Sequence, residues 1–125
     1  MEAATVLNRG KADRAAVEKA LRAAGIDGPI EMVDGSRITA HVTALVEQGA
    51  KRIIVGGGDG SVGAAAQALA GSEAALGILP LGTLNHFARD LGIPFELDRA
   101  AALAGRSPRR PIWSGPDGRC RREGG

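Results

Sequence analysis

The chain has 125 residues, of which 44% are hydrophobic and 24% charged, so it has room for one domain with a real core and not for two. Its two Phe and one Trp are too few for a nucleic-acid surface that works by base stacking. The formal charge of +2 comes from residues 106–125, where six Arg oppose two acidic residues, whereas residues 1–105 hold 10 basic and 12 acidic residues, so no nucleic-acid partner is expected.

The first half of the chain predicts two strand–helix pairs. Short apolar runs at residues 3–7 and 30–33 are typical of strands. The first run is followed by apolar residues at helical spacing, with Asp13 placed to cap that helix at its start and Gly25 at its end. The second run is followed by a buried stripe over residues 38–46, which predicts a second helix.

The second half of the chain repeats this alternation. The expected elements are a strand over residues 53–55, a helix over about 61–70, a strand over 75–79, a helix over 84–91 and a short helix over 99–103. Strands that alternate with helices imply right-handed βαβ units and a parallel sheet covered on both faces. The predicted fold class is therefore α/β, as a Rossmann-like three-layer sandwich with a mainly parallel sheet.

Polar and glycine-rich segments follow the predicted strands. They are Asn8, residues 34–36, residues 56–61 and residues 81–83. In open parallel sheets, ligands bind beyond the carboxyl ends of the strands, where all of these segments fall. We therefore expect four loops to converge on one edge of the sheet.

One of these loops is a glycine turn, Gly-Gly-Gly-Asp-Gly-Ser at residues 56–61, between a predicted strand and a predicted helix. Such a turn exposes backbone N–H groups beside a helix N-terminus, where an anion is favoured. Glycine suits the turn because it reaches positive φ without steric cost and lets a ligand approach the backbone. We interpret the turn as a phosphate cradle that contains one carboxylate, Asp59.

Asp59 is the candidate for the acidic role in this cradle, where it could hold Mg²⁺ or accept a proton from an attacking hydroxyl. The alternative is a helix-cap aspartate that satisfies N–H groups of the following helix. Three preceding glycines favour the functional interpretation, because a plain cap does not need them. Thr83 and Asn85 lie at the start of another predicted helix, and for them nucleotide contact and capping remain alternatives.

Two common phosphate-binding motifs fit less well. Residues 58–63 match the glycine spacing of a dinucleotide fingerprint, but they follow the third predicted strand, and no acidic residue closes the next strand about 20 residues on. No lysine follows the glycines, which excludes a P-loop. The charge of a bound phosphate would then be neutralised by metal, backbone amides and an arginine from elsewhere.

Residues 106–125 lack apolar periodicity and are predicted to be a disordered basic tail, after a domain at residues 1–105. The basic residues and Trp113 could contact an acidic membrane surface, although composition favours a tail without a dedicated partner. No stretch approaches 18 apolar residues, and the N-terminus lacks the layout of a signal peptide. A cytoplasmic protein is expected, with peripheral membrane contact left open.

Two longer motifs carry a family resemblance. Residues 55–62, Val-Gly-Gly-Gly-Asp-Gly-Ser-Val, and residues 78–94, Ile-Leu-Pro-Leu-Gly-Thr-Leu-Asn-His-Phe-Ala-Arg-Asp-Leu-Gly-Ile-Pro, resemble the catalytic domain of the diacylglycerol kinase family. That family includes bacterial lipid kinases and sphingosine kinases and is distantly related to NAD kinases. The resemblance covers about residues 3–105 and implies the N-terminal domain fold of NAD kinases and diacylglycerol kinases.

By this resemblance, the chain would be the ATP-binding half of a lipid kinase that transfers the γ-phosphoryl of ATP to a lipid hydroxyl with Mg²⁺. Asp59 would be the catalytic and metal-binding residue. The nucleotide contacts would be Asn8, Gly56, Gly57, Gly58, Gly60, Ser61, Gly82, Thr83 and Asn85. Ser61 stands where the family usually has threonine and keeps the hydroxyl.

The chain departs from the family pattern in its first loop and in its length. Arg9-Gly10-Lys11 replaces a Pro and a Ser-Gly pair, and Ser36 stands where a threonine contact is common. Family members continue into a β-sandwich that carries the lipid site, so this chain alone is expected to be inactive or nearly so. The alternatives are a non-catalytic nucleotide-binding module and an NAD kinase-like enzyme. An uncovered interdomain face could also promote self-association.

Overall fold

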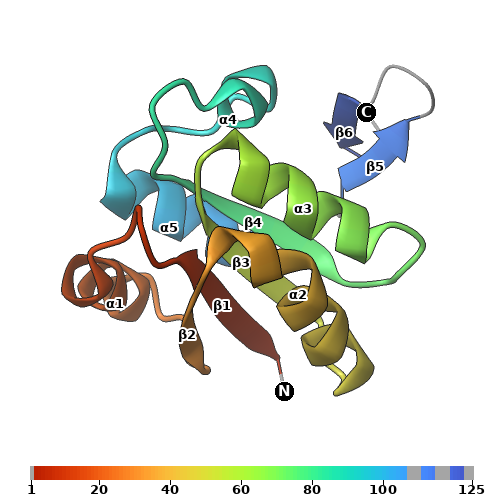
Figure 1. Cartoon of the computed structure of the whole chain (residues 1–125). Coiled ribbons are helices and arrows are strands. Elements are labelled where there is room, and N and C mark those ends of the chain that lie inside the picture. The colour runs from red at the N-terminus through yellow and green to blue at the C-terminus, as the bar shows by residue number, and fades with distance from the viewer. Residues whose placement is uncertain (1, 107–110, 115–118, 123–125) are drawn as a thin grey trace.

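The central sheet consists of four parallel strands in the order β2-β1-β3-β4 (Figure 1). The computed structural model describes residues 2–106, 111–114 and 119–122. The strands are β1 (Ala3–Asn8), β2 (Ile30–Val33), β3 (Arg52–Gly57) and β4 (Ala75–Pro80). Asn8 pairs with Val33 and Gly57 pairs with Pro80, so the last residues of neighbouring strands lie side by side at one edge.

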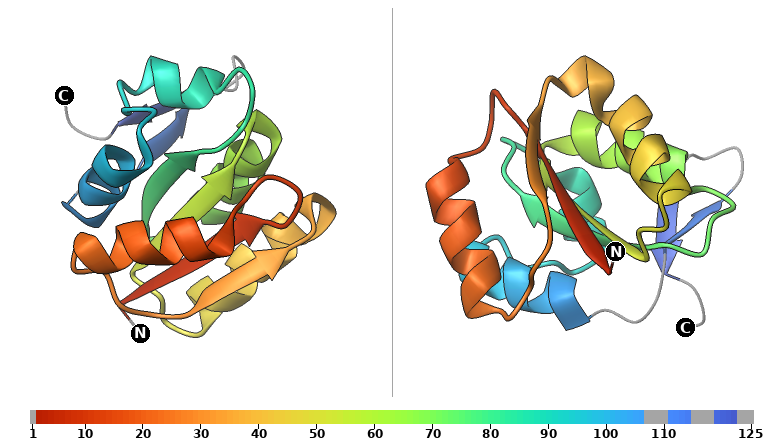
Figure 2. Two further views of the ribbon diagram at one scale, coloured as in Figure 1. Left: turned by 90° about the vertical axis from the view of Figure 1, so that its left-hand side faces the viewer. Right: turned by 90° about the horizontal axis from the view of Figure 1, so that it is seen from below.

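Helices cover both faces of this sheet, as Figure 2 shows. They are α1 (Arg14–Ala23), α2 (Ile38–Glu47), α3 (Asp59–Leu69), α4 (His86–Asp90) and α5 (Leu97–Arg106), with a short 3-10 helix η1 (Gly35–Arg37) before α2. On one face α1 contacts α5, which lies along β4, and on the other face α2 contacts α3. The α/β class and the three-layer arrangement with a parallel sheet, predicted from the sequence, are confirmed.

Side chains of each strand alternate between the two helical layers. Val6 and Val55 pack with residues of α2 and α3, whereas their neighbours Leu7 and Ile54 pack with residues of α1 and α5. All four side chains are fully buried. Because both faces of the parallel sheet are covered, its strands read as continuous apolar runs, and this is why short runs were sufficient to predict them.

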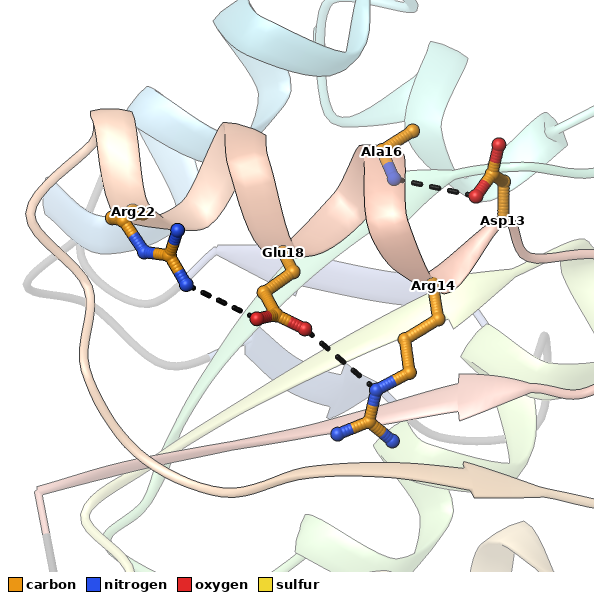
Figure 3. Close-up of polar contacts among 5 residues, drawn as sticks. All are labelled: Asp13, Arg14, Ala16, Glu18 and Arg22. Atoms are coloured by element: carbon orange, nitrogen blue, oxygen red, sulfur yellow. Dashed lines mark hydrogen bonds and ion pairs between the residues drawn. The ribbon is translucent and has the colours of Figure 1, made fainter.

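Helix α1 follows the predicted local rules (Figure 3). The Asp13 carboxylate accepts a hydrogen bond of 3.3 Å from the backbone N–H of Ala16, as expected of an N-terminal cap. Glu18 lies between two guanidinium groups, 3.7 Å from Arg14 and 3.1 Å from Arg22. These two ion pairs are exposed, and each contributes well under about 1 kcal/mol to stability. The helix is held instead by its buried face of Val17, Ala20 and Leu21.

Three helices begin at other residues than predicted. Helix α3 begins at Asp59, two residues earlier than expected, because the extended backbone of Gly58 forms its N-cap. Helix α4 begins at His86 rather than at residue 84, since Asn85 before it has a left-handed backbone with φ +53°. Helix α5 extends beyond the predicted residues 99–103 in both directions.

The C-terminal part of α5 is attached to the sheet. The Arg52 guanidinium, at the start of β3, donates a hydrogen bond of 2.7 Å to the Ala104 carbonyl oxygen. A Cβ added to Gly77 in β4 would lie 2.7 Å from the Cβ of Ala104, so the helix needs a glycine there to pack this closely.

The predicted tail begins at the end of α5. Where the structure describes it, Pro111–Ser114 (β5) and Arg119–Arg122 (β6) form an antiparallel pair, which the sequence pattern did not indicate. The other residues of the predicted tail lie outside the described residues. The boundary at residue 105, the disorder of the tail and its membrane contact therefore stay predictions.

Candidate functional site

Three of the four loops expected at the carboxyl edge of the sheet line a pocket of about 370 Å³. They are the loop after β1, the turn between β3 and α3, and the loop after β4. The lining residues are Asn8, Lys11, Gly58, Asp59, Gly60, Ser61, Gly82, Thr83 and Leu84. The loop after β2, residues 34–36, does not line this pocket, but a Cβ on Gly35 would lie 3.1 Å from the Asn8 amide nitrogen, so that loop supports Asn8 from behind.

Asn8 connects the first loop to the start of α3. Its amide nitrogen donates a hydrogen bond of 2.9 Å to the Ser61 hydroxyl, and its amide oxygen accepts one of 3.0 Å from the backbone N–H of Gly10. Ser61 is buried, with 4% of its surface exposed. The side chains of Asn8 and Ser61 therefore fix two loops relative to each other, across 53 positions of sequence.

Gly56 and Gly57 of the turn are required by close packing and not by positive φ, which the sequence suggested. The described glycines with positive φ are Gly25, Gly28, Gly49, Gly71 and Gly92, so no residue of the turn is among them. A Cβ on Gly56 would lie 2.5 Å from the side chain of Leu7, and one on Gly57 would lie 2.7 Å from the Cβ of Ser61. These two glycines are buried beneath the pocket and serve packing within the protein.

Gly58 and Gly60 do line the pocket, and they differ from each other. Gly58 lies against the loop after β4, where a Cβ on it would come 3.3 Å from the Gly82 Cα, and a Cβ on Gly82 would overlap the Gly58 backbone. A Cβ on Gly60, by contrast, would meet no described atom within 4 Å. Packing therefore explains Gly58 and Gly82, whereas the bare backbone of Gly60 faces open space.

Asp59 lies in the first turn of α3 and holds the start of α4. One carboxylate oxygen accepts a hydrogen bond of 3.0 Å from the backbone N–H of Phe87, and the other lies 3.6 Å from Nδ1 of His86. The side chain is 31% exposed. The sequence leaves capping of its own helix as an alternative for Asp59, but the helix that Asp59 caps is α4, whose bonded N–H lies 28 residues further along the chain.

The surroundings of Asp59 keep it ionised. Partial burial is the largest single influence and would raise its pKa. The backbone N–H groups of His86 and Phe87 and the positive charges of His86 and Arg89 together outweigh burial and lower the pKa of Asp59 from its ordinary value. Asp59 is therefore a carboxylate at neutral pH and a weak proton acceptor.

Asn85 closes the loop after β4. Its amide oxygen accepts a hydrogen bond of 2.9 Å from the backbone N–H of Gly82, and its amide nitrogen donates one of 2.8 Å to the Gly82 carbonyl oxygen. The side chain is 8% exposed, forms no capping hydrogen bond with α4 and is absent from the pocket lining. Thr83, within the turn that Asn85 closes, is exposed and lines the pocket.

Of the ten residues predicted for the site, seven line the pocket, while Gly56, Gly57 and Asn85 lie behind it. The pocket also includes two residues that were not predicted, Lys11 and Leu84. A signal for Lys11 was present, because it follows Asn8 within the first loop. Asp59 is the only acidic side chain among the lining residues. Within the described part of the chain, no group of three or more His, Cys, Asp or Glu side chains could hold a metal ion by itself.

The described domain is thus a parallel α/β sandwich whose pocket, beyond the carboxyl ends of the strands, is lined by a glycine turn and a helix N-terminus. The chain belongs to the diacylglycerol kinase catalytic domain family, whose model matches residues 5–115. The resemblance noted in the sequence is thus confirmed, and the match extends beyond residue 105 into the predicted tail.

Several proteins are similar to this chain in sequence or in structure. A diacylglycerol kinase of Mycobacterium tuberculosis is 42% identical over 84 residues, which cover 66% of this chain and 27% of the relative. The "Probable lipid kinase YegS" of Escherichia fergusonii is 39% identical over 110 residues, covering 79% of this chain and 36% of the relative. A crystal structure of a diacylglycerol kinase from Bacillus anthracis superposes with a TM-score of 0.73 at 26% identity, over 88% of this chain and 43% of that one. The chain thus spans about a third or less of these curated relatives.

Proposed function

We propose that this chain is the ATP-binding part of a lipid kinase, which transfers the γ-phosphoryl group of ATP to a lipid hydroxyl. The observation that carries this proposal is the pocket in which the N-terminus of α3, the bare backbone of Gly60 and the ionised Asp59 lie together, in a chain of the diacylglycerol kinase family. The inference of a lipid substrate rests on family membership alone, because the pocket is lined mainly by polar and glycine residues.

The start of α3 supports binding of the phosphates. The first hydrogen bond of the helix runs from the Val62 N–H to the Gly58 carbonyl oxygen, so the N–H groups of residues 59–61 precede it and have no acceptor within the helix. Together with the helix dipole, these groups favour an anion. A phosphate oxygen can approach Gly60 closely, since no side chain stands in the way.

The donor set of the pocket fits Mg²⁺ that arrives with ATP. Mg²⁺ takes oxygen ligands and is commonly held by one or two carboxylates together with substrate phosphates and water. Asp59 supplies one such carboxylate, and its lowered pKa favours holding a metal over accepting a proton. Bound MgATP would supply the phosphoryl group, while the protein's own share is to position the phosphates on α3 and to keep Asp59 charged.

Asp59→Asn tests this proposal better than Asp59→Ala. Asparagine can still accept the hydrogen bond from Phe87 N–H, so the cap of α4 is kept while the negative charge is removed. We expect Asp59→Asn to weaken binding of MgATP by roughly tenfold or more in calorimetric titration of the 125-residue chain. Binding of ATP without metal should not weaken, because a repulsive charge has been removed.

The matched control is Asp13→Asn, which alters the N-cap of α1 in the same chemical way but lies outside the pocket lining. Equal affinity of wild type and Asp59→Asn for MgATP would refute the metal-binding role of this carboxylate. If NAD displaced ATP with higher affinity, the NAD kinase-like alternative would replace the proposal.

A non-catalytic nucleotide-binding module is a second candidate, because the residues that line the pocket support nucleotide binding and do not by themselves indicate transfer to a lipid. The pocket and the expected MgATP binding would be the same in both cases. Transfer of labelled γ-phosphate to diacylglycerol in mixed micelles separates them, because a binding module would show none.

A further inference from the structure

Lys11 enters the pocket from the loop after β1, on a backbone that is well fixed. Its own N–H donates a hydrogen bond of 3.0 Å to the Asn8 carbonyl oxygen, and the N–H of Ala12 donates one of 3.1 Å to the same oxygen. The Asn8 side chain meanwhile bonds Gly10 and Ser61. The loop that carries Lys11 is therefore held against the start of α3 by a single asparagine.

Lys11 is the only basic side chain among the residues that line the pocket. Within the described ranges it forms no ion pair within 4 Å, whereas Arg9 nearby lies 3.7 Å from Asp34. The acidic residue of the pocket, Asp59, is directed towards the backbone of Phe87 and the ring of His86. The positive charge of Lys11 is thus not neutralised by the carboxylate with which it shares the pocket.

A nucleoside polyphosphate needs more positive charge than the glycine turn provides. Backbone N–H groups and a helix N-terminus contribute only partial charges. In a P-loop, a lysine after the glycines supplies the full charge, and here no lysine occupies that place. An ammonium group on a flexible stem can supply the same charge from a different loop, since it acts as a point charge with three donors.

We propose that Lys11 is a phosphate-binding residue that neutralises the β- or γ-phosphate of the nucleotide, in place of the lysine that the glycine turn lacks. This inference deepens the proposed function and rests on it. It assigns the charged contact to the first loop, where the Arg9-Gly10-Lys11 sequence departs from the Pro and Ser-Gly pattern of the family.

The test compares Lys11→Gln with Lys51→Gln, because both remove one positive charge from an exposed lysine. Lys51 directly precedes β3 and so lies at the opposite edge of the sheet from the pocket. Binding of MgATP, MgADP, AMP and adenosine to the 125-residue chain is measured by calorimetric titration at several salt concentrations. Thermal unfolding checks that each variant is folded.

We expect Lys11→Gln to weaken the binding of MgATP and MgADP by about tenfold or more and to reduce the salt dependence of that binding. The affinities for adenosine and AMP should change by less than about twofold. Lys51→Gln should leave the affinities for all four ligands unchanged, and Lys11→Arg should restore most of the affinity for MgATP. Unchanged MgATP affinity in Lys11→Gln overturns the inference and leaves the proposed function standing. An equal loss for adenosine also overturns it, because the effect would then be structural. A wild-type chain that binds no ATP would refute the proposed function itself.

Discussion

At the scale of single residues, the carboxylate of Asp59 has two partners in the protein before any ligand arrives. The Phe87 N–H and the His86 ring lie against its two oxygens, and the pKa of Asp59 is lowered as a result, despite partial burial. Part of the role of Asp59 is therefore structural, because α4 has five residues and is too short to be stable by itself.

The lowered pKa predicts how stability depends on pH. A carboxylate whose folded pKa lies below its unfolded value stabilises the fold above the unfolded pKa, and this contribution is lost as the pH falls through the folded pKa. We therefore expect Asp59→Asn to be less stable than wild type at pH 7 in urea unfolding. The difference should shrink as the pH is lowered through and below the ordinary carboxyl range. A difference that stayed constant as the pH fell through and below that range would show that the charge of Asp59 does not stabilise the fold.

At the scale of elements, the glycine turn combines two kinds of glycine that look alike in the sequence. The space beside the Gly57 Cα is filled by other side chains, since a Cβ on Gly57 would lie 2.7 Å from Ser61 and 3.2 Å from Asn8. Gly60 faces open space. The pattern of residues 56–61 correctly predicts a strand, a turn and a helix, but the packing of Gly57 depends on contacts with residues far away in sequence.

Gly57→Ala should therefore destabilise the chain by about 1–3 kcal/mol, because the added methyl group forces the Ser61 or Asn8 side chain to move. Urea unfolding measures this loss. Since Asn8 and Ser61 would lose their hydrogen bond, the variant should also bind MgATP less tightly. Stability equal to that of wild type would mean that the contact relaxes without cost.

Gly60→Ala should behave in the opposite way. Its φ is not positive and a Cβ there meets no described atom, so alanine in the first turn of α3 should keep or raise stability, by up to about 1 kcal/mol. Binding of MgATP should nevertheless weaken, because the methyl group stands where a phosphate would approach the backbone. A variant that is stable and binds MgATP as well as wild type would place the phosphates elsewhere in the pocket.

At the scale of the whole molecule, much of the architecture can be read from the sequence. The parallel sheet, the helices on both faces and the edge where the loops meet follow from apolar runs, caps and the rule for parallel strands. The family follows from the motifs at residues 55–62 and 78–94. The cap of α4 by Asp59 and the hydrogen bond between Asn8 and Ser61 could not be read, because each is a tertiary contact between residues far apart in the sequence.

None of the helices in the described ranges is long and apolar enough to cross a bilayer. Two large apolar side chains, Leu84 and Phe95, are nevertheless 57% and 47% exposed, and they flank α4 in the sequence. The Arg89 guanidinium of α4 lies 5.4 Å from the centre of the Phe95 ring, so the exposed Phe95 side chain contacts the helix that Asp59 caps.

Asp59 both lines the pocket and accepts a hydrogen bond from the start of α4, so binding in the pocket could be detected at α4. If the proposed Mg²⁺ bound Asp59 through the oxygen that accepts the Phe87 hydrogen bond, it would compete with that N–H and weaken the attachment of α4 at its first turn. In that case, amide hydrogen exchange at Phe87 would be faster when MgATP is added.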